Sequence, residues 1–201
     1  MSASWPVVLA AGDVRLRPLR RKDEAAWFRL RTTNREWLAR WEATSPIGVR
    51  SATPSFTGFL RILRRQARRG TDLPFGIEYR GELVGQLTVS GLSRGSLWSG
   101  SIGYWVSEHV AGRGIVPTAV ALAVDHCMHS RGLHRIEINI RPENAASLRV
   151  VEKLGFREEG LRPRYLHIDG SWRDHLSFAL TAEEVGDGLL ARWHRSRDQA
   201  R

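Results

Sequence analysis

Two glycines placed just before an apolar helix could hold a phosphate. Gly112 and Gly114 follow a predicted strand that ends near Val106, and an apolar stretch from about 115 to 131 comes next. The first N–H groups of a helix have no partner within the helix and lie at the positive end of its dipole, which favours an anion. Glycine lacks a Cβ, so a ligand can approach its backbone closely. The segment therefore predicts a phosphate or pyrophosphate site, with an ordinary strand-to-helix loop as the alternative.

Asn144 and Ser147 form a second pair that could do chemistry. Asparagine is a favoured helix N-cap, and the pattern predicts a helix from Asn144 to Leu154 that stops at Gly155. This places Ser147 on the first turn of that helix. Its hydroxyl could be part of an ordinary helix start, or it could face a bound ligand.

The sequence shows no covalent nucleophile. Cys127 lies in the apolar run from Val120 to Met128, which is typical of a packed helix residue, and no serine occupies a Gly-x-Ser-x-Gly turn. A single cysteine excludes an internal disulfide and fits a reducing compartment.

Composition and charge narrow the class of protein. A chain of 201 residues with 42% hydrophobic and 26% charged residues fits one domain with a buried core. The N-terminus lacks the features of a secretory leader, and no apolar run is long enough to cross a bilayer, so we expect a cytoplasmic protein without membrane contact. A net charge of +10 would attract polyanions such as RNA, ribosomes or phosphorylated cofactors, although it could also be a merely solvated surface.

The spacing of apolar residues predicts the elements that would position these groups. The predicted strands are 14–19, 75–79, 83–89, 98–106, 135–141, 156–168 and 171–180. The predicted helices are 23–31, 34–41, about 53–70, 115–131, 144–154 and one amphipathic helix from about 181. This order indicates an α/β fold with a mixed sheet. The helix from about 53 carries arginines on its polar face: Arg61, Arg64, Arg65 and Arg68.

Four segments resemble the GCN5-related N-acetyltransferase (GNAT) superfamily, over nearly the whole chain. They are Ile102–Val106 with Gly112–Ile115, Pro142–Ser147 with Glu152–Phe156, Asn34–Leu38, and Tyr165–His175. The last two are similar to ribosomal-protein-alanine N-acetyltransferases of the RimJ/RimL type, and to the RimJ branch most. The resemblance implies one domain over 1–201, with a core of about 13–180 and a C-terminal helix and basic tail over 181–201. It implies an α/β fold with a mixed, mostly antiparallel central sheet, flanking helices and a splayed acetyl-CoA cleft.

The resemblance also implies an activity. Acetyl-CoA would be the co-substrate, without a metal, and its acetyl group would move to a protein N-terminal α-amine by direct attack on the thioester. The partner would be a ribosomal protein N-terminus or the ribosome, and the basic surface could contact rRNA. Two alternatives stay open: a small-molecule amine acetyltransferase, and a non-catalytic acyl-CoA- or RNA-binding module. The acceptor and the oligomeric state stay undefined.

The family pattern implies a cofactor site split between two segments. Its residues would be Val106, Ser107, Val110, Ala111, Gly112, Arg113, Gly114, Ile115, Asn144 and Ser147. Val106 and Ser107 would lie beside the pantetheine arm, and backbone amides from Val110 to Ile115 would hold the pyrophosphate. The family usually has Gln or Arg three positions before the first glycine. His109 stands there in this chain, which puts a side-chain contact to phosphate in doubt.

The expected catalytic residues are Ser147, Tyr165 and Glu137. In the resembled subgroup, the serine that matches Ser147 points at the cofactor sulfur and can give it a proton, and Tyr165 is the alternative donor. Glu137 could act as base through a water chain, with Glu108 and His109 as further candidates.

The acceptor side is less defined. Four tryptophans could wall an acceptor groove, with residues 42–55 as its lid, although core packing explains them equally well: Trp37, Trp41, Trp105 and Trp172. The RimJ branch tends to carry an acidic residue just before the tyrosine matched by Tyr165. Arg164 replaces it here, which removes one candidate base and could favour an acidic acceptor.

Overall fold

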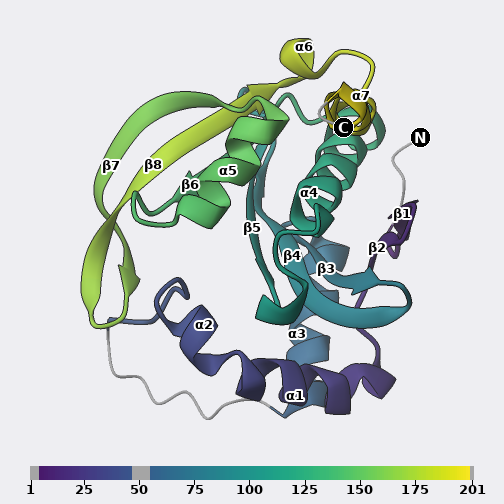
Figure 1. Ribbon diagram of the computed structural model, residues 1–201, viewed down its shortest axis with the longest axis vertical. Helices are drawn as coiled ribbons and strands as arrows, with labels where there is room; N and C mark the ends of the chain where they lie inside the picture. The colour runs from purple at the N-terminus through teal and green to yellow at the C-terminus, as the bar shows by residue number, and fades with distance from the viewer. Residues whose placement is uncertain (1–4, 47–54, 200–201) are drawn as a thin grey trace.

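A computed structural model describes residues 5–46 and 55–199, which form one eight-stranded sheet with flanking helices (Figure 1). The strand order is β1-β2-β3-β4-β5-β6-β8-β7. Neighbouring strands are antiparallel except for β5 and β6, which are parallel. This confirms the predicted α/β fold with a mixed, mostly antiparallel sheet. In the described ranges, no helix is both long and apolar enough to cross a membrane.

The N-terminal half supplies the first five strands and three helices. Its elements are β1 (Leu9–Ala11), β2 (Val14–Arg17), the 3-10 turn η1 (Arg21–Asp23), α1 (Glu24–Thr33), α2 (Arg35–Ala39), α3 (Phe56–Arg69), β3 (Leu73–Tyr79), β4 (Glu82–Ser93) and β5 (Ser99–Val106). The predicted start of α3 near residue 53 lies outside the described residues. Within them, the Ser55 hydroxyl caps the helix by accepting from the Gly58 N–H at 3.2 Å.

The C-terminal half supplies the remaining elements. They are the 3-10 turn η2 (Glu108–Val110), α4 (Ile115–Asp125), the π-helical turn η3 (His126–Ser130), β6 (Arg135–Ile140), α5 (Ala145–Leu154), β7 (Arg157–Ile168), β8 (Ser171–Thr181), α6 (Ala182–Val185) and α7 (Leu189–Gln199).

Both ends of the chain differ from the expectation. The predicted single C-terminal helix is two helices, because Gly186 and Gly188 adopt φ values of 59° and 138° between them. Leu189 and Trp193 of α7 are buried, and the Trp193 indole donates a hydrogen bond to Thr118 Oγ1 of α4 at 3.0 Å. β1, which alternation did not indicate, pairs with β2. The packed structure thus extends on both sides of the expected core, 13–180.

The main hydrophobic cluster surrounds α4. Every residue of α4 from Ile115 to Val124 except Val116 is buried, so this helix is apolar on all sides and fixed against the sheet. Cys127 is fully buried beside it, and burial raises the pKa of its thiol to about 12. The prediction that Cys127 is a packing residue is confirmed. A second, smaller cluster lies under α1 and α3.

Strands β5 and β6 part after a short pairing. Their partners are Ser99 with Arg135, Gly100 with Ile136, and Ser101 with Glu137. Beyond these, β5 continues to Val106 along β4 alone, and β6 continues to Ile140 along β8 alone. Backbone groups that face the gap lack the partners that a continuous sheet would give them. The gap between the strands is therefore a place where another molecule can complete the hydrogen bonding.

Candidate active site

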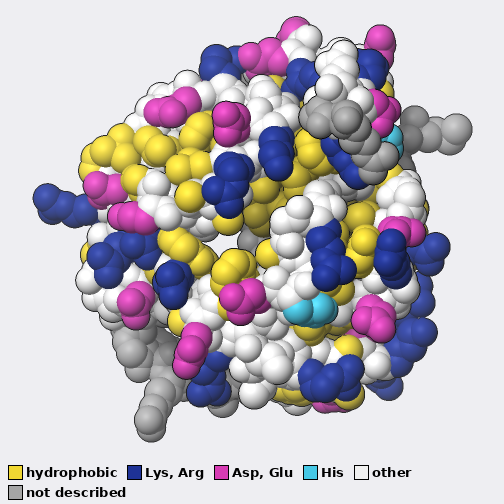
Figure 2. Space-filling view, in the orientation of Figure 1, with side chains coloured by type: hydrophobic (Ala, Val, Ile, Leu, Met, Phe, Trp, Pro, Cys, Tyr) yellow, Lys and Arg dark blue, Asp and Glu magenta, His cyan; other side chains and the backbone are white. Residues whose placement is uncertain are grey.

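Two adjoining clefts open where β5 and β6 part. The first cleft has a volume of about 520 Å³ and is lined by α2, the end of β5 and the starts of α4 and α5. The second cleft, of about 500 Å³, is lined by β4, β5, β6 and β8 and by the segment after α2. Figure 2 shows the molecule hollowed near its centre, with hydrophobic side chains on the walls and Lys or Arg at the rim. Residues lining both clefts are Leu38, Trp41, Tyr104, Trp105, Asn144 and Ser147.

The loop before α4 presents backbone donors to the first cleft. Gly112 and Gly114 have φ values of 78° and 76°, which glycine adopts without strain. Within the described part of the chain, no hydrogen bond engages the N–H groups of residues 112–116, and no side chain caps α4. Arg149 and Lys153 of α5 line the same cleft. Free N–H groups, a helix start and two cations suit an anion.

Fewer backbone N–H groups are free to bind an anion than the sequence predicts. The N–H groups of Val110 and Ala111 donate to the carbonyls of Ser107 and Glu108, at 3.2 and 2.9 Å, so both are used within the η2 turn. The side chains of Val110 and Ala111 still line the first cleft. The side chain of Arg113 is exposed, lies outside the lining and donates to the His109 carbonyl at 3.2 Å.

The buried side chain of Asn34, between α1 and α2, is hydrogen-bonded to the segment that follows β5. The Asn34 side chain, in a residue only 4% exposed, donates from Nδ2 to Ser107 Oγ at 2.8 Å. Its Oδ1 accepts from the Glu108 N–H at 2.9 Å. Ser107 is itself only 2% exposed and also contacts His109 Nδ1 at 2.8 Å. The Ser107 hydroxyl is therefore a structural contact. The residue, expected beside the pantetheine arm, lines neither cleft, and its N–H donates to the Val84 carbonyl at 2.8 Å.

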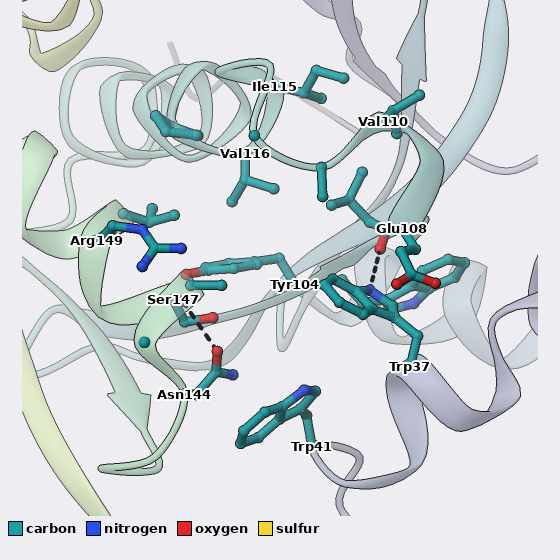
Figure 3. Close-up of a pocket in the computed structure, with 18 of the residues that line it drawn as sticks. Trp37, Trp41, Tyr104, Glu108, Val110, Ile115, Val116, Asn144, Ser147 and Arg149 are labelled. Carbon is teal, nitrogen blue, oxygen red and sulfur yellow. Dashed lines mark hydrogen bonds between the residues drawn. The ribbon is translucent and has the colours of Figure 1, made fainter.

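Trp37 reinforces the same connection. Its indole N–H donates to the Val106 carbonyl at 3.1 Å, which fixes α2 against the last residue of β5 (Figure 3). Buried hydrogen bonds of this kind strengthen one another in a low-dielectric interior. These bonds hold α2 and the end of β5 together along the first cleft.

The start of α5 lies between the clefts. As predicted, Asn144 caps this helix, because its Oδ1 accepts from the Ser147 N–H at 3.1 Å (Figure 3). The ring of Tyr104 reaches across from β5, so that its hydroxyl lies beside Ser147. Among the described residues, the buried Tyr104 hydroxyl has no hydrogen-bond partner by distance and angle. Burial raises the pKa of Tyr104 to about 12, an effect that the neighbouring Ser147 hydroxyl partly offsets.

Tyr104 is thus a protonated donor next to Ser147 at neutral pH. The motif spacing does not single it out for this role, because its only signal is a position two residues before the end of the strand that leads into the glycine loop. The position of its hydroxyl depends on how far β5 and α5 separate.

The other two expected catalytic residues lie away from this junction. The Glu137 carboxylate pairs with Arg135 and with Arg162, each at 2.9 Å, at the level where β5 and β6 still pair. Tyr165 is exposed on β7, and its hydroxyl accepts from Arg162 at 3.2 Å. Neither Glu137 nor Tyr165 lines either cleft. Both Glu137 carboxylate oxygens are thus occupied by guanidinium groups, away from the junction.

The aromatic wall forms in part as expected. Three of the four tryptophans line the clefts: Trp37, Trp41 and Trp105. Trp172 is 53% exposed and lies outside both. Of the expected lid, Ala43 forms a bridge to β7 and the Thr44 N–H donates to the His167 carbonyl at 2.8 Å. Residues 47–54 of that lid lie outside the described residues.

A parted parallel strand pair, an anion site at a helix start and a hydroxyl pair at the junction of two clefts define a group-transfer enzyme of the N-acetyltransferase class. The chain belongs to the GNAT acetyltransferase family, because residues 13–157 match its acetyltransferase (GNAT) domain.

Individual relatives agree with this assignment. The chain is 37% identical to the probable N-acetyltransferase YjcK of Bacillus subtilis over 124 residues, 60% of this chain and 68% of that protein. It is 32% identical to the [ribosomal protein uS5]-alanine N-acetyltransferase of Escherichia coli over 159 residues, 77% of this chain and 80% of the relative. The crystallised Mycobacterium smegmatis RimJ, in complex with CoA-disulfide, is similar with a TM-score of 0.90 and 44% identity, over 98% of each chain.

The Asn34–Ser107 contact generates a stability prediction. Asn34→Ala and Ser107→Ala should each destabilise the protein, because each leaves the partner's buried polar groups unpaired. The double variant should lose less than the sum of the single losses, by about 1–2 kcal/mol. Urea unfolding of the four proteins measures this coupling.

The matched control for that cycle uses a second buried hydrogen bond. Thr118→Ala removes the partner of Trp193, and its effect should add to that of Asn34→Ala within about 0.5 kcal/mol. Additive losses for Asn34 and Ser107 would show that the two side chains do not act together.

Proposed function

We propose that this protein transfers the acetyl group of acetyl-CoA to the N-terminal α-amine of a ribosomal protein, in the cytoplasm where ribosomes work. The observation that carries the proposal is the likeness to the M. smegmatis RimJ over 98% of both chains, combined with two clefts that meet at Ser147. The E. coli relative acts on an alanine of ribosomal protein uS5. The N-terminus of uS5 is therefore the first acceptor to test.

The first cleft fits the donor. The free N–H groups of residues 112–116 would hold the pyrophosphate, and Arg149 and Lys153 would face further phosphate charge. The open edge of β5 near Val106 would pair with the amides of the pantetheine arm. When bound, acetyl-CoA supplies the activated thioester.

The junction residues account for the chemistry of transfer. A bond forms between the amine nitrogen and the carbonyl carbon, the carbon–sulfur bond breaks, and the sulfur needs a proton. Ser147 would donate that proton to the sulfur and take one back from solvent in the open cleft, while the Tyr104 hydroxyl beside it would donate a hydrogen bond to the Ser147 oxygen. A backbone N–H near Val106 would stabilise the negative charge on the carbonyl oxygen.

A basic helix face supports docking on ribosomal RNA as part of the same proposal. Within the described residues, the exposed arginines of α3 form no ion pair: Arg61, Arg64, Arg65, Arg68 and Arg69. Some arginines elsewhere, such as Arg17 and Arg135, are paired with carboxylates, whereas α3 gathers on one helix five arginines that are unpaired in the described part of the chain. The apolar face of α3 packs inside the protein, so the helix is not free to insert into lipid. Unpaired arginines along a helix suit a phosphate backbone.

The acceptor assignment has a direct test. A peptide with the N-terminal sequence of uS5 should gain one acetyl group and release one thiol from acetyl-CoA, and the same peptide with a blocked α-amine should not react. Mass spectrometry and thiol titration measure both. Polyamines and aminoglycosides serve as small-amine controls. Thiol release with these amines alone would replace the proposal, and CoA binding without release to any amine would indicate a non-catalytic module.

The role of Ser147 predicts a separation of rate from affinity. Ser147→Ala should lower kcat by at least about tenfold, because the sulfur loses its proton donor. The affinity for acetyl-CoA should change little, since the backbone donors of the loop remain. Tyr104→Phe should have a smaller effect in the same direction. Activity assays measure kcat, and calorimetry measures the affinity for acetyl-CoA. An unchanged kcat would remove Ser147 from the mechanism.

The RNA proposal predicts a loss confined to the ribosome. Replacing Arg61, Arg64, Arg65 and Arg68 by glutamine should weaken binding to small ribosomal subunits and flatten its salt dependence, by a slope of about 0.7–0.9 for each lost phosphate contact. Acetylation of the free peptide should not change. The control with equal charge loss replaces four exposed arginines outside α3: Arg15, Arg21, Arg29 and Arg195. Equal weakening in both variants would show an effect of net charge alone.

A further inference from the structure

The second cleft contains a buried histidine. His175 lies on β8, opposite Arg162 of β7, and is only 3% exposed although its side chain lines the cleft. Its ring meets that of Tyr165 edge to face, with centroids 5.6 Å apart. Ser147 and Tyr104, at the junction of the two clefts, line the same cavity.

The hydrogen bonding of His175 determines which ring nitrogen is free. Nδ1 lies 3.0 Å from the Arg173 carbonyl, which can only accept, so Nδ1 carries the hydrogen. In the neutral ring, Nε2 then holds the lone pair. Among the described residues, the one hydrogen bond found for the ring is that of Nδ1. His175 therefore carries an unused acceptor nitrogen, and the residue lines a cavity that adjoins the junction.

The surroundings keep this ring neutral near pH 7. The charged and titratable groups around it are Arg141, Glu143, Asp174, Arg162 and Tyr165. Burial lowers the pKa of His175 below its ordinary value, and Arg141 lowers it further. The Arg173 carbonyl, Glu143 and Asp174 oppose this shift without reversing it.

Three carboxylates around the second cleft are engaged in ion pairs, and Glu108 lines only the first cleft. Glu42 pairs with Arg31 at 2.6 Å, and Glu143 pairs with Arg141 at 3.2 Å. Glu137 is held by Arg135 and Arg162. Among the described residues that line the second cleft, His175 is the only histidine, and the other titratable side chain that is uncharged near neutral pH is Tyr104, whose hydroxyl is a far weaker base than an imidazole.

We propose that Nε2 of His175 is the base that receives the proton of the acceptor amine. The inference rests on the proposed acetyl transfer to an amine, and it assigns the group that this reaction lacks. The proton leaves the amine nitrogen for Nε2 while the carbon–nitrogen bond forms. The carbon–sulfur bond breaks, and the sulfur takes its proton from Ser147, which solvent in the cleft then reprotonates. The resulting imidazolium, still bonded through Nδ1 to the Arg173 carbonyl, passes its proton to solvent.

The test is the pH dependence of kcat/KM for the peptide acceptor. An N-terminal amine titrates near pH 8, so the wild-type logarithm should fall with a slope of about one below that pH. Below the lowered pKa of His175, the slope should become about two, because both groups must be unprotonated. His175→Gln should keep a slope of about one throughout and lose at least about tenfold in kcat near pH 7.5.

The control is a second buried histidine. His126 is 5% exposed, its pKa is also lowered by burial, and it lines neither cleft. His126→Gln should therefore retain the wild-type pH profile. Thermal unfolding and acetyl-CoA binding of both variants show whether His175→Gln folds and holds the donor.

The outcomes separate this inference from the proposed function. Failure of the proposed function would appear as no acetylation of the peptide by the wild-type protein. The role of His175 would be overturned if the active wild type kept a slope of about one at low pH. It would also be overturned if His175→Gln had the wild-type pH profile. If that variant does not fold, the wild-type limb alone decides.

Discussion

Strands β5 and β6 run side by side for three residue pairs and then part, which leaves backbone groups along the gap without the partners of a continuous sheet. The separation occurs in the middle of the sheet, because β4 still supports β5 and β8 still supports β6. The opening therefore lies inside the sheet, between two strands that each keep one paired neighbour.

Several contacts hold the end of β5 in place beside this gap. β4 packs so closely that a Cβ at Gly85 would lie 2.2 Å from the Trp105 carbonyl oxygen, which only glycine permits. Trp37 bonds the Val106 carbonyl, and Asn34 holds the next turn of chain. The helix α4, which is buried along most of its length, anchors the C-terminal end of the anion loop. The site is thus built from interactions between segments that are distant in sequence.

The features that could be predicted were those with local signals. Strand alternation, the glycine pair before α4 and the Asn144 cap each depend on a few neighbouring residues, and the structure contains all three. Positions that depend on distant partners were missed. Asn34 forms a hydrogen bond with the Ser107 hydroxyl, 73 residues away in the sequence, and Arg162 forms one with Glu137, 25 residues away.

Tyr165 shows how one strand irregularity redirects a side chain. The register of β7 shifts between Arg162 and Leu166, and Arg164 within this stretch has a positive φ of 50°. Simple alternation along the strand therefore fails to say which residue faces the cleft. His175, on the regular partner strand, occupies the position beside the cavity instead.

The junction of the clefts also determines the kinetic order of the reaction. Cys127, the single thiol of the chain, is fully buried, so no cysteine is accessible to carry the acetyl group as a covalent intermediate. Donor and acceptor must then occupy their clefts at the same time. Double-reciprocal plots for the two substrates would intersect, and labelled CoA would exchange into acetyl-CoA only when the acetylated acceptor is also present. The acetyl group would therefore pass directly from acetyl-CoA to the acceptor without an acetyl-cysteine intermediate.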